Sequence, residues 1–242
     1  MLPSRQGSSF LTTRWSVLAA AASPDPVLSR AALETLCAGT WYPLYAFVRR
    51  HGHGADDARD LVQGFFASFL EKADLASLDP ARGRFRSFLL ASIRNWMADE
   101  RERANAQKRG GGARSISIDF EDADERYRVD PGADLSPERL FERQWAIALL
   151  ALALARIEAE YVSSGKRDLF EALKPALQGR SADAPLAEIA TRLDSTEGAV
   201  KLAVHRLRKR FREALRAEIA ETVSTEEQIE EEIADLFRAL ES

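Results

Sequence analysis

The sequence predicts an all-α protein that consists of two small helical domains joined by a flexible linker. Apolar residues recur at spacings of three and four along most of the chain, which is the period of amphipathic helices. Residues 110–137 interrupt this pattern with three consecutive glycines, an acidic cluster and two prolines, a composition typical of a linker. A short strand over 115–120 is compatible with the sequence, but it has no obvious partner.

Before the linker we expect five helices. The first is short, can be capped by Thr12 or Thr13, and carries Trp15, Val17 and Leu18. The next two cover about 27–38 and 42–52, and Gly52 and Gly54 end the second of these. Residues 55–73 form a strongly amphipathic helix, and a further helix runs from Phe85 to about residue 109. The apolar stripe of the 55–73 helix consists of Leu61, Phe65, Phe66, Phe69 and Leu70.

After the linker, helical patterns resume over 137–162, 168–177, 185–193, 196–216 and 226–240. Five segments follow from these assignments: an N-terminal extension (1–25), a first helical domain (26–109), the linker (110–137), a second helical domain (138–220) and an acidic C-terminal helix (221–242).

The composition excludes several classes of protein. The chain has 34 Lys and Arg against 38 Asp and Glu, and its single cysteine, Cys37, rules out an intrachain disulfide and fits a reducing compartment. The longest apolar run, 145–155, is too short to span a bilayer, and the N-terminus lacks a signal-peptide pattern. These observations predict a cytoplasmic protein without membrane contact.

The sequence offers no set of residues for catalysis or for binding a metal or cofactor. It has three histidines and one cysteine, and it has no glycine-rich phosphate loop. His51 and His53 stand close together, but no further ligands lie near them, so a loop at a helix end explains them better than a metal site. We therefore expect neither an enzyme nor a bound cofactor.

Residues 185–211 predict a helix-turn-helix. Their two helices flank the segment 194–198, where Ser195 or Thr196 can cap the second helix. One face of the second helix is apolar and carries Val200, Ala203, Val204, Leu207, Phe211, Ala214 and Leu215. In such a motif the N-terminal half of the second helix enters the major groove.

Charge indicates DNA as the ligand of this motif. Residues 196–216 hold seven Lys or Arg against two Glu, and clustered cations neutralise phosphates while Arg and Lys also reach base edges. A basic face alone would suit a solvated core helix, but a tight turn and a supporting helix precede this one. The candidate DNA contacts are Glu197, Lys201, His205, Arg206, Arg208, Lys209 and Arg212.

A second basic segment lies in the first domain. Residues 82–114 contain nine basic and three acidic residues with Phe85, Phe88 and Trp96 interleaved, a pattern that suits single-stranded nucleic acid. A domain core explains each aromatic residue taken singly better, and we expect Phe85 and Phe88 to be buried.

The two modules, in this order, resemble the bacterial RNA polymerase sigma factors of the extracytoplasmic-function group. The first signature is Asp57-Ala58-Arg59-Asp60-Leu61-Val62-Gln63-Gly64, followed by Phe65. The second comprises Phe85, Phe88-Leu89, Arg94-Asn95, Asp99 and Arg101, and the third pairs Glu188-Ile189-Ala190 with Gly198-Ala199-Val200-Lys201 and His205-Arg206. The resemblance covers about residues 30–220.

This resemblance implies a sigma factor that binds core RNA polymerase and directs promoter-specific initiation. The helix 55–73 would dock on the clamp helices of the largest polymerase subunit through Asp57, Asp60, Leu61, Gln63 and Phe65. The loop 74–84 and the helix after it would open and read the minus-ten element, with Arg86, Arg94, Asn95 and Arg101 as contacts. The helix 196–212 would read the minus-thirty-five element.

The sequence departs from the family pattern at several positions. Arg59 and Gly64 replace acidic residues, Leu202 and Ala203 stand where Ser and Arg are common, and the loop 179–185 is long. The extensions at both ends resemble those of subgroups controlled by a kinase or by appended segments, so a kinase or an anti-sigma factor is a further expected partner.

Two other functions remain open at this stage. A dimeric repressor that acts without polymerase would explain 185–216 but not the first domain. A helical adaptor could instead use both basic faces to bind acidic proteins.

The acidic tail raises a separate expectation. Its apolar stripe contains Ile229, Ile233, Leu236, Phe237 and Leu240, so it needs a surface to pack on. We expect this surface on the second domain, where the tail would compete with DNA for the basic face; the alternative is a packing helix whose charges face water.

Overall fold

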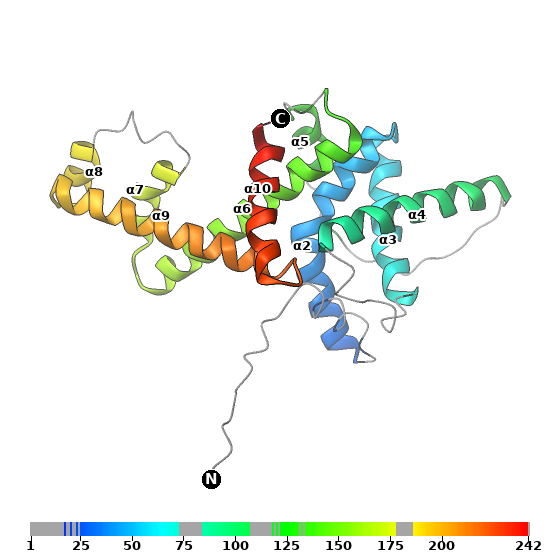
Figure 1. Ribbon diagram of the computed structural model, residues 1–242, viewed down its shortest axis with the longest axis horizontal. Coiled ribbons are helices and arrows are strands. Elements are labelled where there is room, and N and C mark those ends of the chain that lie inside the picture. The colour runs from blue at the N-terminus through cyan, green and yellow to red at the C-terminus, as the bar shows by residue number, and fades with distance from the viewer. Residues whose placement is uncertain are drawn as a thin grey trace, which may run out of the picture. The chain divides into compact units, whose positions relative to one another are not determined.

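The computed structural model describes residues 17, 20, 23, 25–72, 84–106, 118, 120, 122–130, 132, 134–177 and 186–241, and every element among them is helical (Figure 1). This confirms the prediction of an all-helical protein. The N-terminal extension, the loop 74–84 and the strand considered over 115–120 lie almost entirely outside the described residues.

The described residues form two compact units. The first unit combines residues from 1–148 with residues from 220–242, and the second contains residues 149–219. The chain therefore leaves the first unit within α6 (Pro137–Ser163) and returns to it at the end of α9 (Glu197–Ala220). The linker that we predicted over 110–137 does not coincide with this division, because α6 is one unbroken helix whose two halves pack in different units.

The first unit begins with α2 (Pro26–Arg50), where the sequence predicted two shorter helices. The Asp25 carboxylate caps α2 by accepting a hydrogen bond from the Val27 amide at 2.9 Å, and Pro26 occupies the first helical turn. Pro43 lies inside α2 without ending it. A proline in a helix interior costs about 3 kcal/mol, and the burial of the large side chains around it, Leu44, Tyr45 and Phe47, offsets this loss.

The core of the first unit is aromatic and joins α2 to α4 (Phe85–Ala106) and to the first half of α6. The Trp145 ring stacks on Phe141 with centroids 6.1 Å apart, and it lies 6.2 Å from the buried ring of Phe85. Phe47 of α2 contacts Phe141 at 6.3 Å. Residues 137–148, which the sequence assigned mostly to the second domain, therefore complete the core of the first.

Part of the predicted linker is folded onto α2. The short helix α5 (Ala123–Arg128) lies within it, and Asp124 of α5 forms an ion pair with Arg49. The Arg126 guanidinium lies 3.6 Å from the centroid of the Tyr42 ring. An acidic and polar composition predicted a flexible segment, but these contacts to α2 fix its position.

The chain after α5 is also held by α2. Arg50 donates hydrogen bonds to the Gly132 carbonyl oxygen at 2.7 Å and to the Leu135 carbonyl oxygen at 2.9 Å. Gln144 of α6 donates to Asp130. Among the described residues of the first unit, α3 (Ala55–Lys72) and α10 (Glu226–Glu241) are also helical.

The second unit contains the second half of α6, α7 (Arg167–Leu173), the 3-10 turn η3 (Lys174–Leu177), α8 (Leu186–Arg192) and most of α9. Its core includes Ile157, Phe170 and Leu207, which are buried almost completely. Gly165 joins α6 to α7 with φ +69°, in the left-handed region that favours glycine. Among the helices of the described residues, none has both the length and the apolarity needed to cross a membrane.

Candidate functional site

One exposed surface lies on α3. Asp57 and Asp60 are exposed, and Leu61 and Gln63 are half-buried beside them. Phe65, predicted to belong to the same surface, has only 2% of its area exposed and is part of the core of the first unit. The structure therefore keeps the polar part of the predicted binding surface but leaves Phe65 no area for contact with a partner.

The two unusual residues of α3 have structural roles. Arg59 pairs with Asp56 at 3.1 Å, one turn earlier on the same helix. Gly64 lies under Trp96 of α4, where an added Cβ would meet the indole ring at 3.2 Å. The Trp96 Nε1–H donates to the Leu61 carbonyl oxygen at 3.1 Å. Gly64 therefore permits the close approach of α4 to α3, which no local sequence signal indicated.

The predicted nucleic-acid residues of α4 differ in accessibility. Asn95 and Arg101 are exposed. The Arg94 side chain is 47% exposed, forms an ion pair with Glu138 and lies 5.8 Å from the centroid of the Phe47 ring. Arg94 thus presents part of its guanidinium to solvent, and Asn95 and Arg101 are available to a ligand.

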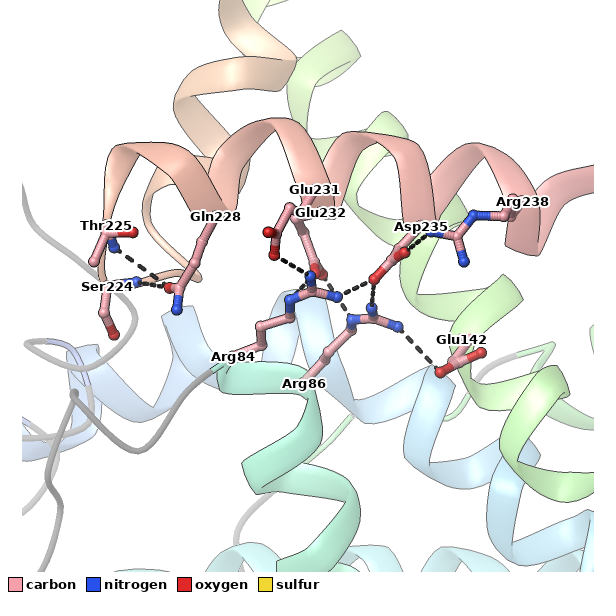
Figure 2. A network of polar contacts seen from close by, with 10 residues as sticks. All are labelled: Arg84, Arg86, Glu142, Ser224, Thr225, Gln228, Glu231, Glu232, Asp235 and Arg238. Atoms are coloured by element: carbon pink, nitrogen blue, oxygen red, sulfur yellow. Dashed lines mark hydrogen bonds and ion pairs between the residues drawn. The ribbon is translucent and has the colours of Figure 1, made fainter.

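Arg86, the fourth predicted contact of α4, is buried with only 7% of its area exposed. It lies with Arg84 at the start of α4, and both guanidinium groups face carboxylates of α10 (Figure 2). The carboxylates in this cluster are those of Glu231, Glu232 and Asp235 from α10 and of Glu142 from α6. In this structure Arg86 is not accessible to DNA.

These contacts also overturn the expected position of the acidic tail. We expected α10 to pack on the second domain, but it belongs to the first unit. The Arg86 Nε atom lies 2.7 Å from Glu232 Oε1, and the Arg84 Nε atom lies 3.2 Å from Glu232 Oε2. An acidic helix is attracted to any basic surface, so charge alone did not distinguish the second domain from the start of α4.

Burial and charge act in opposite directions on the carboxylates of this cluster. Burial raises the pKa of Glu232, and the charges of Arg86 and Arg84 offset only part of this effect. Burial would also raise the pKa of Asp235, but hydrogen bonding and attraction from Arg84, with the charge of Arg86, lower it below the usual value. Within this cluster Glu232 and Arg86 are buried, whereas the Glu231 side chain is 67% exposed, so dehydration affects its members unequally.

In the second unit, α8 and α9 are separated by a tight turn. Asp194 adopts the left-handed conformation with φ +46°, and the Ser195 amide donates to the Ala190 carbonyl oxygen at 2.9 Å. Of the two predicted caps, Thr196 begins α9, because its Oγ1 accepts a hydrogen bond from the Ala199 amide at 3.2 Å. This turn fixes where the basic helix starts.

The two faces of α9 have the predicted polarity. Val200, Val204 and Leu207 are buried. The predicted DNA contacts are all exposed, namely Glu197, Lys201, His205, Arg206, Arg208, Lys209 and Arg212. Leu202 lies on this exposed face with 49% of its area accessible.

The exposed cations of α9 are not equally free. Arg208 donates to the Ala176 carbonyl oxygen from Nε at 3.3 Å and from a terminal nitrogen at 3.0 Å. Lys209 pairs with Glu213 at 3.8 Å, with both side chains mostly exposed. Within the described part of the chain, Lys201, His205, Arg206 and Arg212 have no carboxylate at ion-pair distance.

A shallow groove of about 430 Å³ runs beside α9. Lys166, Arg206, Lys209 and Arg210 line it together with one acidic residue, Glu213. The sequence analysis counted Arg210 among the basic residues of 196–216 but not among the candidate DNA contacts. It did not single out Lys166, which precedes α7 and meets α9 only through tertiary packing. The positive lining suits an anionic backbone.

Comparison with known families identifies a segment of the first unit. Residues 43–107 match the family model named Sigma-70 region 2. No match was found among curated proteins or among solved structures. The matched segment contains the exposed acidic residues of α3 and the exposed polar residues of α4. Residues 43–107 are therefore a sigma-70 region 2 domain.

Proposed function

We propose that the chain is a sigma factor of the extracytoplasmic-function group, a non-enzymatic protein that binds core RNA polymerase and directs initiation at promoters with a minus-ten and a minus-thirty-five element. The observation that carries this proposal is the combination of a region 2 domain with a second unit that exposes a basic helix after a tight turn. A polymerase-independent repressor would need only the basic helix. A protein that acts on core polymerase and promoter DNA would do so in the cytoplasm.

The exposed residues suggest that different helices contact different partners. Asp57 and Asp60 of α3 would contact the clamp helices of the largest subunit, where exposed charges guide docking and select the partner. Asn95 and Arg101 of α4 would contact the minus-ten element. Opening of this element needs bases to be unstacked and held, which polar and aromatic side chains near a helix start can supply.

The second unit would act as the helix-turn-helix of region 4. In this arrangement α8 supports α9, and the first half of α9 enters the major groove of the minus-thirty-five element. Lys201 and His205 lie in that half with exposed side chains. The groove lined by Lys166 and Arg210 would receive the phosphate backbone.

Transcription reconstituted from purified components tests the proposal. The full chain added to core polymerase should give initiation at discrete start sites on a library of promoter fragments, whereas core alone should not. Tight binding to duplex DNA without any association with core would favour the repressor. Binding to core without initiation at any fragment would contradict the proposed role in promoter recognition.

We expect two kinds of behaviour from α9 variants. Replacement of Lys201 or His205 by Ala should weaken binding by about 1–3 kcal/mol at one position of the upstream element and relax the preference there, because a base contact is lost. Replacement of Lys209 by Ala should weaken binding to all DNA sequences alike, because a phosphate contact is lost. The slope of log affinity against log salt concentration should also decrease by about one. Binding to a scanned set of promoters at several salt concentrations measures both effects, and identical profiles for the three variants would refute the assignment.

A further inference from the structure

The C-terminal helix α10 is unusual because the middle of its buried face carries a charge. Its buried residues are Ile229, Glu232 and Leu236, which lie on one side of the helix at spacings of three and four. Glu232 is fully buried, with none of its area exposed. An apolar residue at this position would suit a helix whose only task is to pack.

The contacts of Glu232 do not compensate fully for its burial. Both carboxylate oxygens lie at ion-pair distance from Arg84 and Arg86, yet neither oxygen, nor the Arg86 Nε atom, has a hydrogen bond of good geometry. A buried ion pair of this kind roughly breaks even against its dehydration, and apolar residues of similar volume often hold better. The contact of Glu232 with Arg84 and Arg86 therefore adds little to the stability with which α10 is held on α4.

The two arginines are suited to other anions. A guanidinium group pairs with a phosphate in the same forked geometry as with a carboxylate. Figure 2 shows both guanidinium groups on one side of α10, facing the carboxylates of Glu231, Glu232 and Asp235. If α10 moves away, both guanidinium groups lose their α10 carboxylates, and Arg86 keeps only Glu142 of α6 among the carboxylates of this cluster.

The backbone at the start of α4 is covered as well. The Phe85 amide, which begins the helix, donates a hydrogen bond to the Thr222 carbonyl oxygen at 2.9 Å. The first amides of a helix have no partner within the helix, and they bind anions when nothing else covers them. The segment 222–241 thus occupies both the side chains and the backbone at this end of α4.

We propose that Arg84 and Arg86 form an anion site for the phosphates of a single DNA strand and that the segment 222–241 acts as an acidic strap that occupies this site in the absence of DNA. The inference rests on the proposed function, since it assigns the ligand to the strand that region 2 would bind during promoter opening. The strap competes with DNA through carboxylates that take the positions of phosphate oxygens.

The strength of this competition follows from the fraction of molecules in which the strap is open. The apparent dissociation constant equals the intrinsic constant divided by that fraction, so a site that is open one tenth of the time binds about tenfold more weakly. Substitutions that weaken the strap should therefore increase the affinity for DNA by up to this factor. The effect should be largest at low salt, because ions screen the attraction between the strap and the arginines.

The test uses the full chain with Glu231→Gln and Asp235→Asn combined, which removes two strap charges and leaves the buried Glu232 in place. Fluorescence anisotropy with a labelled single-stranded DNA oligonucleotide should show binding tighter by roughly three- to tenfold at low salt, with the difference shrinking as salt rises. Arg84→Ala in the same background should remove the gain. Unchanged or weaker binding by the double variant would leave α10 a purely structural role.

A matched control separates release of the site from a general change of charge. Glu227→Gln combined with Glu241→Gln removes the same number of charges from α10 at exposed positions that do not contact Arg84 or Arg86. This control should bind DNA nearly like the unmodified chain. An equal gain in both double variants would show that long-range charge, and not competition for the arginines, controls affinity.

A second measurement needs no substitution. Hydrogen exchange of the unmodified chain should show faster exchange of the α10 amides when the oligonucleotide is bound, because the strap leaves its site. Unchanged protection of α10 in a complex that has formed would refute the strap. Neither assay contains polymerase, so the two hypotheses can fail separately. If the chain supports initiation but α10 stays protected on DNA, only the strap is refuted. If DNA releases α10 but the chain never supports initiation, only the proposed function is refuted.

Discussion

Replacement of Trp145 by Ala is expected to destabilise the first unit by about 3–5 kcal/mol, the range for removing a large aromatic side chain from a packed core. Trp145 is 2% exposed and contacts Phe85 of α4 and Phe141 of α6, so its removal leaves a cavity beside these two rings. Urea denaturation followed by hydrogen exchange of individual segments measures the effect and shows where it occurs.

The location of the effect tests the division of the chain within α6. If residues 137–148 belong to the first unit, Trp145→Ala should accelerate exchange in α2 and α4, whereas Leu207→Ala should accelerate it in α8 and α9. Trp145→Phe is the matched control: it keeps an aromatic ring and removes the indole nitrogen, which has no hydrogen-bond partner, so it leaves a smaller cavity and its cost should be well below that of Trp145→Ala. A Trp145→Ala variant that loosens α9 instead of α2 would contradict the division.

The sequence predicted most of the helices because their apolar spacing and their caps are local. The face of α9 that carries Val200, Val204 and Leu207 is buried as expected, and the cap at Thr196 was one of two candidates. Two predicted helices merged into α2 because the burial of Leu44, Tyr45 and Phe47 is a tertiary effect that outweighs the local signal of Pro43.

The errors concern packing partners, which periodicity does not specify. The apolar stripe of α10 indicated that the helix must pack, but not that it would meet Arg84 and Arg86. Glycines and acidic residues over 110–137 suggested a flexible linker, yet Asp124 and Arg126 bind α2 through contacts with residues far away in the sequence. The role of Gly64 depends on Trp96, more than thirty residues later, and no local pattern reveals it.

Periodicity also predicted which residues of the binding surfaces are exposed. Exposure of Asp57, Asp60, Lys201 and His205 followed from their positions on amphipathic helices. The burial of Phe65 was also indicated by its place in the apolar stripe of α3, but the family resemblance suggested a surface role for the same residue. Where the two kinds of evidence disagreed, the periodicity gave the correct position.

The expected effect of Asp60→Lys on polymerase binding is larger than that of any other exposed substitution. Asp60 is exposed on α3 within the region 2 domain, and Asp57 lies one turn before it on the same helix. Reversal of a charge at a docking surface places like charges opposite each other, which costs several kcal/mol, so we expect affinity for core polymerase to fall at least about 100-fold. The free energy of unfolding should change by less than about 0.5 kcal/mol, because Asp60 is exposed and forms no ion pair with the described residues.

Glu241→Lys is the matched control for this variant, because it introduces the same change of charge at an exposed position at the end of α10. Titration of labelled protein with core polymerase at moderate salt should separate the two variants, with Glu241→Lys close to the unmodified chain. A weaker effect at high salt is expected for both, since screening reduces the contribution of exposed charges. If Asp60→Lys binds core as tightly as Glu241→Lys does, α3 does not dock through its acidic face, and the contact with polymerase must involve another surface of the region 2 domain.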